Sequence, residues 1–160
     1  MLDVEDKAAA FAKVHSDTDS DALVIPGWGK DEWGVLFSYA ADVHLPAGAT
    51  LFQQKEADRT LYFVVSGVLE AAVSGGAQAL APLRLMYPGS VVGEVAFFDG
   101  RPRSAQVWAV EDSALLRLEY AAYAKFAAAH VKRANELLFG LGRLVALRLR
   151  HSTVRATSPH

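Results

Sequence analysis

The sequence predicts an α+β fold, in which an antiparallel β-barrel or jelly roll is flanked by N-terminal helices and a C-terminal pair of helices. Helix-favouring, alanine-rich segments occur near both ends of the chain. Between them, residues 42–118 contain short runs of β-branched and aromatic residues separated by Gly and Pro turns. This pattern is typical of an antiparallel sandwich or barrel. With 160 residues, 52% of them hydrophobic, the chain can form one compact domain with a substantial core.

The N-terminal part predicts helices over residues 2–15 and 30–41. The first is rich in alanine and has acids in its first turn, where they complement the helix dipole. In the second, apolar residues recur at helical spacing; they are Trp33, Leu36, Phe37 and Ala40. A polar break, SDTDSD, and the turn PGWG separate the two helices. We therefore assign residues 1–32 to an N-terminal helical segment and residues 33–155 to the main domain with its C-terminal helices.

Strands are predicted within residues 42–53, 60–73, 75–92 and 103–118. Turn residues punctuate these segments at Pro46-Ala47-Gly48, Ser66-Gly67, Gly75-Gly76, Pro88-Gly89 and Asp99-Gly100. The Gly75-Gly76 pair stands where a tight hairpin would form.

The C-terminal part predicts a helix over residues 119–130 and a longer one over residues 131–152. A narrow apolar seam runs along the longer helix, formed by Leu137, Leu141, Leu144 and Leu147. Gly140 and Gly142 weaken this helix but would let another backbone approach it closely.

Several classes of protein are disfavoured by composition and motifs. The sequence has no cysteine, which excludes disulfides, thiolate zinc sites and iron–sulfur clusters. Its net charge of −2 gives no case for nucleic acid, and its five histidines lack metal-ligand spacing. There is no nucleophile elbow and no GxxxxGK loop, so we expect no enzyme, no metal site and no cofactor. The acidic N-terminus lacks a signal-peptide pattern, and Arg143 and Arg148 interrupt the most apolar late segment, so we expect a cytoplasmic protein without membrane insertion.

The stretch GEVAFFDGRPRSA, residues 93–105, carries the candidate chemistry. VAFF suits a single helical turn, whose unpaired N–H groups favour an anion. Arg103 can donate a forked pair of hydrogen bonds to a phosphate, and Ser104 can add a hydroxyl donor. Glu94 would repel a phosphate but can accept from a sugar hydroxyl. These residues fit a ligand with a phosphate and a ribose hydroxyl; the alternative is an ordinary turn in which Glu94 and Arg103 pair with each other.

This stretch resembles the phosphate-binding cassette of cyclic nucleotide-binding domains, as found in Crp/Fnr-type regulators, protein kinase regulatory subunits and gated channels. That cassette reads Gly-Glu, apolar residues, a short loop, often Pro, then Arg, Ala or Ser, and Ala. Upstream, LPAGATLF, ADRTLYFVVSG and MYPGSVVGE are similar to the successive barrel strands and turns of the family. The resemblance covers roughly residues 33–150 and implies the cyclic nucleotide-binding domain fold.

The resemblance also implies roles for individual residues. Glu94 would accept from the ribose 2′-hydroxyl, and Arg103 would neutralise the cyclic phosphate. Ser104, Ala105 and the backbone at Gly93 and Val95 would complete the phosphate shell. The base would lie against Ala71, Leu83 and Met86. At the C-terminal helix, Arg148 would stand near Glu94, and Ser152 and Thr153 would touch the base; a polar helix end is the alternative there.

The expected function is that of a cyclic nucleotide-sensing regulatory domain in signal transduction, which acts by ligand-induced movement of its terminal helices. We expect cAMP rather than cGMP, because Gln106 stands where some family members carry a Thr that favours guanine. We expect a homodimer through the C-terminal helix and an unidentified effector protein. Only VRATSPH follows that helix, so we expect no helix-turn-helix domain and no direct DNA binding. The alternatives are a degenerate, non-binding domain that serves as a dimerisation or docking scaffold, and a regulatory subunit for an enzyme or transporter.

Overall fold

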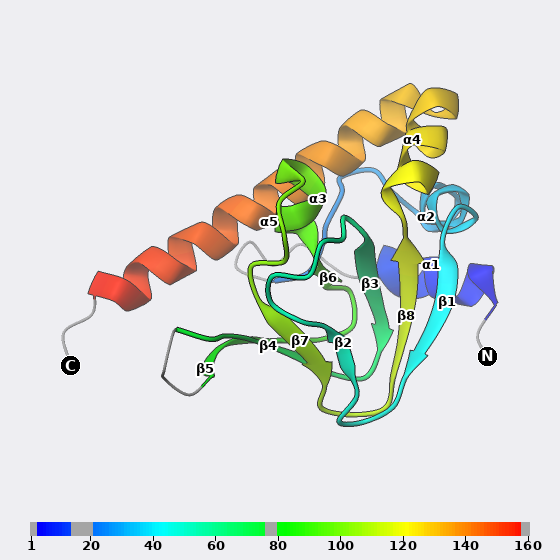
Figure 1. The fold of residues 1–160 in the computed structure, drawn as a ribbon. Coiled ribbons are helices and arrows are strands. Elements are labelled where there is room, and N and C mark those ends of the chain that lie inside the picture. The colour runs from blue at the N-terminus through cyan, green and yellow to red at the C-terminus, as the bar shows by residue number, and fades with distance from the viewer. Residues whose placement is uncertain (1–2, 14–20, 76–79, 158–160) are drawn as a thin grey trace.

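Two antiparallel four-stranded sheets pack face to face in the computed structural model, which describes residues 3–13, 21–75 and 80–157. The first sheet has the order β1 (Ala41–Leu45), β8 (Ser113–Leu118), β3 (Leu61–Ser66), β6 (Val91–Val92). The second has the order β2 (Thr50–Phe52), β7 (Gln106–Ala109), β4 (Leu69–Val73), β5 (Ala81–Met86). The helices lie outside this sandwich, so the predicted α+β fold is confirmed (Figure 1). The predicted hairpin turn at Gly75-Gly76 falls partly outside the described residues.

Strand β3 shows why the sandwich holds together, because it is buried on both faces. Side chains alternate between the two faces of a strand. Leu61, Phe63 and Val65 therefore pack into a core beneath the helices. Tyr62 and Val64 point the other way and pack between the two sheets.

Helices cover the outer face of the first sheet. They are α1 (Val4–Ala12), α2 (Lys30–Phe37), α4 (Tyr120–Ala129) and α5 (Val131–Thr157). Phe11 of α1 places its ring 5.0 Å from Trp33 and 5.9 Å from Phe63, so α1 contributes directly to the main core. Helix α2 ends at Phe37, earlier than predicted, because the chain already enters β1 at Ala41.

Helix α5 runs diagonally across the molecule, past α3 and toward β5 (Figure 1). It continues to Thr157, beyond the predicted end at residue 152. The leucine seam faces the protein's own core, where Leu137, Leu141 and Leu144 are fully buried. A Cβ at Gly140 would lie 2.9 Å from the Ile25 side chain, so this glycine permits the close approach. In the described part of the chain, no helix is both long enough and apolar enough to cross a membrane.

Candidate functional site

A cavity of about 100 Å³ opens where the second sheet, the GEVAFFDGRPRSA segment and α5 meet. Most of the residues that the sequence proposed as a binding site line it. They are Ala71, Leu83, Met86, Gly93, Glu94, Val95, Arg103, Ser104, Ala105 and Arg148. Residues from separate strands and from the last helix are thus brought to one place. Their role as a binding site is still a prediction.

The short helix α3 (Glu94–Asp99) forms one wall of the cavity. It contains the VAFF run, for which the sequence predicted a single helical turn. It begins after Gly93, whose φ of 89° is in the left-handed region that favours glycine. It ends at Gly100, whose N–H donates to the Ala96 carbonyl. Beside it, the Arg59 guanidinium donates to the Phe97 carbonyl and lies 3.7 Å from the Tyr120 ring centre. The wall is therefore fixed at both ends.

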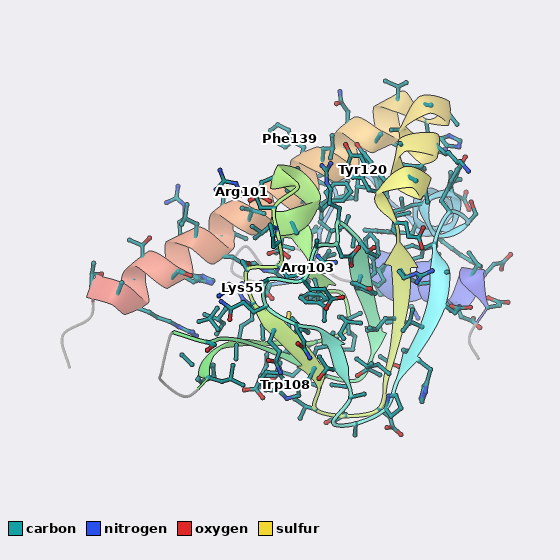
Figure 2. The ribbon with its side chains drawn as sticks, viewed as in Figure 1. Lys55, Arg101, Arg103, Trp108, Tyr120 and Phe139 are labelled. Carbon is teal, nitrogen blue, oxygen red and sulfur yellow. The ribbon has the colours of Figure 1, made fainter. Side chains whose placement is uncertain are left out.

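Arg103 is buried at the base of this wall, with only 2% of its surface exposed. Figure 2 shows it inside the molecule, whereas Arg101 projects outward. Its Nη2 donates to Asp58 Oδ2 at 2.6 Å and to the Thr60 carbonyl at 2.8 Å, and its Nη1 donates to the Gly93 carbonyl at 3.1 Å. The guanidinium also lies 4.2 Å from the centre of the Phe52 ring. Among the described residues its Nε has no hydrogen-bond partner.

Glu94 pairs with Arg148 rather than with Arg103. Arg148 Nη1 lies 2.7 Å from Glu94 Oε1, and both side chains are buried. The same guanidinium contacts Asp21 through Nε at 2.7 Å and through Nη2 at 3.0 Å. The alternative in which Glu94 and Arg103 pair with each other is therefore wrong, because each charge has a different partner.

The ionisation of these groups follows from their surroundings. Burial opposes the charged form of Arg148, but attraction to Glu94 and hydrogen bonding to Asp21 outweigh it and raise its pKa. Burial lowers the pKa of Arg84, and repulsion from Arg148 lowers it further. Arg84 still carries a charge, because an arginine is not deprotonated in proteins. The cavity therefore presents three guanidinium groups and one carboxylate, which suits an anion.

Three predicted or implicated residues do not line this cavity. The Ser152 hydroxyl donates to the Arg148 carbonyl, and the Thr153 hydroxyl donates to the Leu149 carbonyl, both one helical turn back along α5. Ser152 lines a neighbouring cavity of about 290 Å³ instead. Gln106 begins β7 opposite Ala72 and is absent from the cavity wall. The preference for cAMP drawn from Gln106 therefore has no support in the geometry.

Sequence reasoning missed Phe52, Arg84, Asp58 and Asp21. Arg84 pairs in register with Ala71 on β4, so the strand pairing could have suggested that it lies near the pocket. Asp58 and Asp21 lie in irregular segments, 45 and 127 residues from their arginine partners. No local pattern signals such distant ion pairs.

A comparison with family models decides the identity of the domain. Residues 42–130 match the model of the cyclic nucleotide-binding domain, which is more than half of the chain. The chain belongs to this family. Within the described residues, no group of three or more His, Cys, Asp or Glu side chains could hold a metal ion.

Relatives of this cyclic nucleotide-binding domain include the cyclic AMP receptor protein of Thermus thermophilus, 32% identical over 129 residues. That alignment covers 79% of this chain but only 56% of the relative, so the chain spans about half the length of the relative. The crystal structure of the Thermus thermophilus catabolite activator protein is 29% identical and superposes with a TM-score of 0.73, over 82% of this chain and 60% of that one. A cyclic nucleotide-binding domain from Methylobacillus flagellatus, 21% identical, has a TM-score of 0.81 over 98% of this chain and 85% of that one, which shows a common fold.

Replacing Gly93 by Ala is expected to destabilise the protein more than replacing Gly48 by Ala. Both glycines have a positive φ, 89° and 81°, so both variants carry left-handed strain of about 1–2 kcal/mol. Only at Gly93 would the added Cβ contact Arg103 Nη1 and lie 2.7 Å from the Thr60 carbonyl. At Gly48 it would meet nothing within 4 Å. Urea unfolding of both variants measures the difference, and equal losses would contradict this account.

The Asp58–Arg103 pair predicts a pH-dependent stability. Burial raises the pKa of Asp58, but hydrogen bonds from Thr60 and Arg103 outweigh it, so its pKa is lowered in the folded protein. The stabilisation is then fully present above the ordinary carboxyl pKa of about 3.9 and is lost as the pH falls through the lowered value. We expect Asp58→Asn to cost about 1–3 kcal/mol at neutral pH, since Arg103 keeps its carbonyl acceptors.

Unfolding free energies of wild type and Asp58→Asn, measured from pH 7 to pH 3, test this prediction. The difference between them should shrink only toward the acid end. Glu111→Gln, which changes an exposed acid before β8, serves as a control and should leave stability nearly unchanged. A constant difference across this range would contradict the assignment.

Proposed function

We propose that this domain is a sensor that binds a cyclic nucleotide in the cavity beside α3, and that binding moves α5 relative to the sandwich. The observation that carries the proposal is that one cavity presents two complementary groups, an acceptor and a cation. Glu94 is a buried acceptor, and Arg103 is a buried cation whose Nε still lacks a partner among the described residues. A cyclic nucleotide offers both counterparts, a ribose hydroxyl and an anionic phosphate.

The remaining cavity residues support the same ligand. The hydroxyl of Ser104 can donate to a phosphate oxygen beside Arg103. Ala71, Leu83 and Met86 provide an apolar surface against which a base can lie. The similarity to a protein named cyclic AMP receptor protein favours cAMP as the ligand.

The size of the cavity supports a movement on binding. It measures about 100 Å³, whereas ligand pockets usually enclose about 300–1,000 Å³. Arg148 closes one side of it and belongs to α5, so this helix is the element that a ligand would displace. A ligand that binds the open arrangement better would shift the population of α5 positions.

The exposed face of α5 supports a homodimer as the assembly that carries the signal. Phe139 is 85% exposed and points away from the sheets (Figure 2). Exposed residues follow it at alternating spacings of three and four; they are Gly142, Ala146, Leu149 and Thr153. This spacing is that of a helix-pairing seam, and nothing lies within 4 Å of where a Gly142 Cβ would be. A non-binding scaffold of the same fold would use this face as well.

Titration calorimetry with cAMP and cGMP tests the sensor. We expect micromolar affinity for cAMP, about −8 kcal/mol. Arg103→Ala should weaken binding at least tenfold, or by about 1.4 kcal/mol, because the phosphate loses its cation. Arg101→Ala, in the same loop but exposed, is the matched control and should bind like wild type. Circular dichroism confirms that each variant is folded.

Absence of heat at millimolar cAMP and cGMP would rule out the sensor and favour the scaffold. Wild-type affinity in Arg103→Ala would show that the phosphate site lies elsewhere.

Sedimentation equilibrium tests the assembly. Wild type is expected to dimerise, and Phe139→Asp is expected to dissociate, because a charge would replace the largest apolar group of the seam. Val110→Asp is the control, since Val110 is also an exposed valine but lies between β7 and β8, outside α5. A wild type that stays monomeric at high concentration would refute the dimer.

A further inference from the structure

Arg148 is held by two carboxylates that arrive from different parts of the chain. Asp21, in the segment before α2, takes Nε and Nη2 at 2.7 and 3.0 Å. Glu94, at the start of α3, places Oε1 2.7 Å from Nη1. One guanidinium therefore joins the N-terminal segment, the cavity wall and α5.

The contact to Asp21 fixes the orientation of this guanidinium. Nε and Nη2 form one edge of the planar group, and a carboxylate that takes both fixes its plane. Nη2 is further engaged by the Ser90 hydroxyl at 3.1 Å and the Val91 carbonyl at 2.9 Å. Nη1 is the terminal nitrogen that remains for Glu94. Arg148 is 6% exposed, so bulk water does not compete strongly for these positions.

Because the nitrogens of Arg148 are shared between Asp21 and Glu94, the second oxygen of Glu94 is available to accept a hydrogen bond from another group. Without a second carboxylate, the forked guanidinium of an arginine frequently pairs with both oxygens of its acid. Arg148 would then occupy the whole Glu94 carboxylate. Because Asp21 holds the other edge, Glu94 keeps Oε2 as an acceptor for a hydroxyl in the cavity.

We propose that Asp21 is a positioning residue for hydroxyl recognition: it holds Arg148 so that Glu94 is buried and paired, yet still free to accept from the ribose 2′-hydroxyl. This inference rests on the proposed function and deepens it. It assigns part of the selectivity of the pocket to the N-terminal segment, none of whose described residues lines the cavity.

The neighbouring groups are consistent with this role. Ser90 is buried, and its hydroxyl donates to the Asp21 backbone carbonyl at 3.1 Å while it accepts from Arg148. Arg84 faces Asp21 at 3.5 Å from β5, so Asp21 also separates two cations that line the cavity. Asp21 itself is one-third exposed, with 34% of its side chain accessible, so replacing it does not open the core.

The test compares the affinities for cAMP and for 2′-deoxy-cAMP, which lacks only the hydroxyl that Glu94 would bind. Wild type should prefer cAMP at least tenfold, and Glu94→Gln should lose most of this preference. Asp21→Asn, an isosteric change, should lower the preference at least threefold while its affinity for 2′-deoxy-cAMP stays within threefold of wild type. Ser90→Ala should lower the preference by a smaller factor.

Asp112→Asn is the matched control, because Asp112 also ties two segments together by accepting from the Ala47 N–H but does not line the cavity. Its preference should equal that of wild type. If Asp21→Asn keeps the wild-type preference, or weakens both nucleotides by the same factor, this inference is overturned and the sensor function stands. If wild type binds neither nucleotide, the sensor function falls, and this inference falls with it.

Discussion

The arrangement of the site depends on one constraint, which is that a buried guanidinium must have its charge compensated. Arg103 and Arg148 are 2% and 6% exposed. Leaving either without partners would cost several kcal/mol. Each therefore binds a carboxylate from outside the cassette, Asp58 or Asp21, together with backbone carbonyls. Satisfying these two charges draws distant segments together around a single cavity.

The two arginines belong to different parts of the molecule. Arg103 is tied to the Gly93 carbonyl and stacked near Phe52, so it belongs to the sandwich and the α3 wall. Arg148 belongs to α5, which packs across the helix side of the core. In the function proposed, a ligand that contacts Glu94 is linked through Arg148 to the position of α5. Such coupling is reciprocal, so a partner that holds α5 would also change ligand affinity.

The N-terminal segment is integrated into this arrangement. Phe11 packs against Trp33 and Phe63 in the main core, and Lys7 is buried beside Asp42 at the start of β1. Asp21 then reaches Arg148 in the C-terminal half of α5. Removing this segment would therefore expose apolar surface and alter the candidate site together.

The sequence by itself determined the order of helices and strands, the α+β class and the cassette from Gly93 to Ala105. It could do so because periodicity, turn glycines and cassette spacing are local properties of the chain. Only the tertiary structure decided which ionic partners Glu94 and Arg103 have. It also decided that the leucine seam of α5 faces the protein's own core, and that Ser152 and Gln106 lie away from the cavity. These depend on which segments meet when the sheets close and α5 crosses them. Contacts between residues as far apart as Asp21 and Arg148 leave no pattern in the sequence that could reveal them.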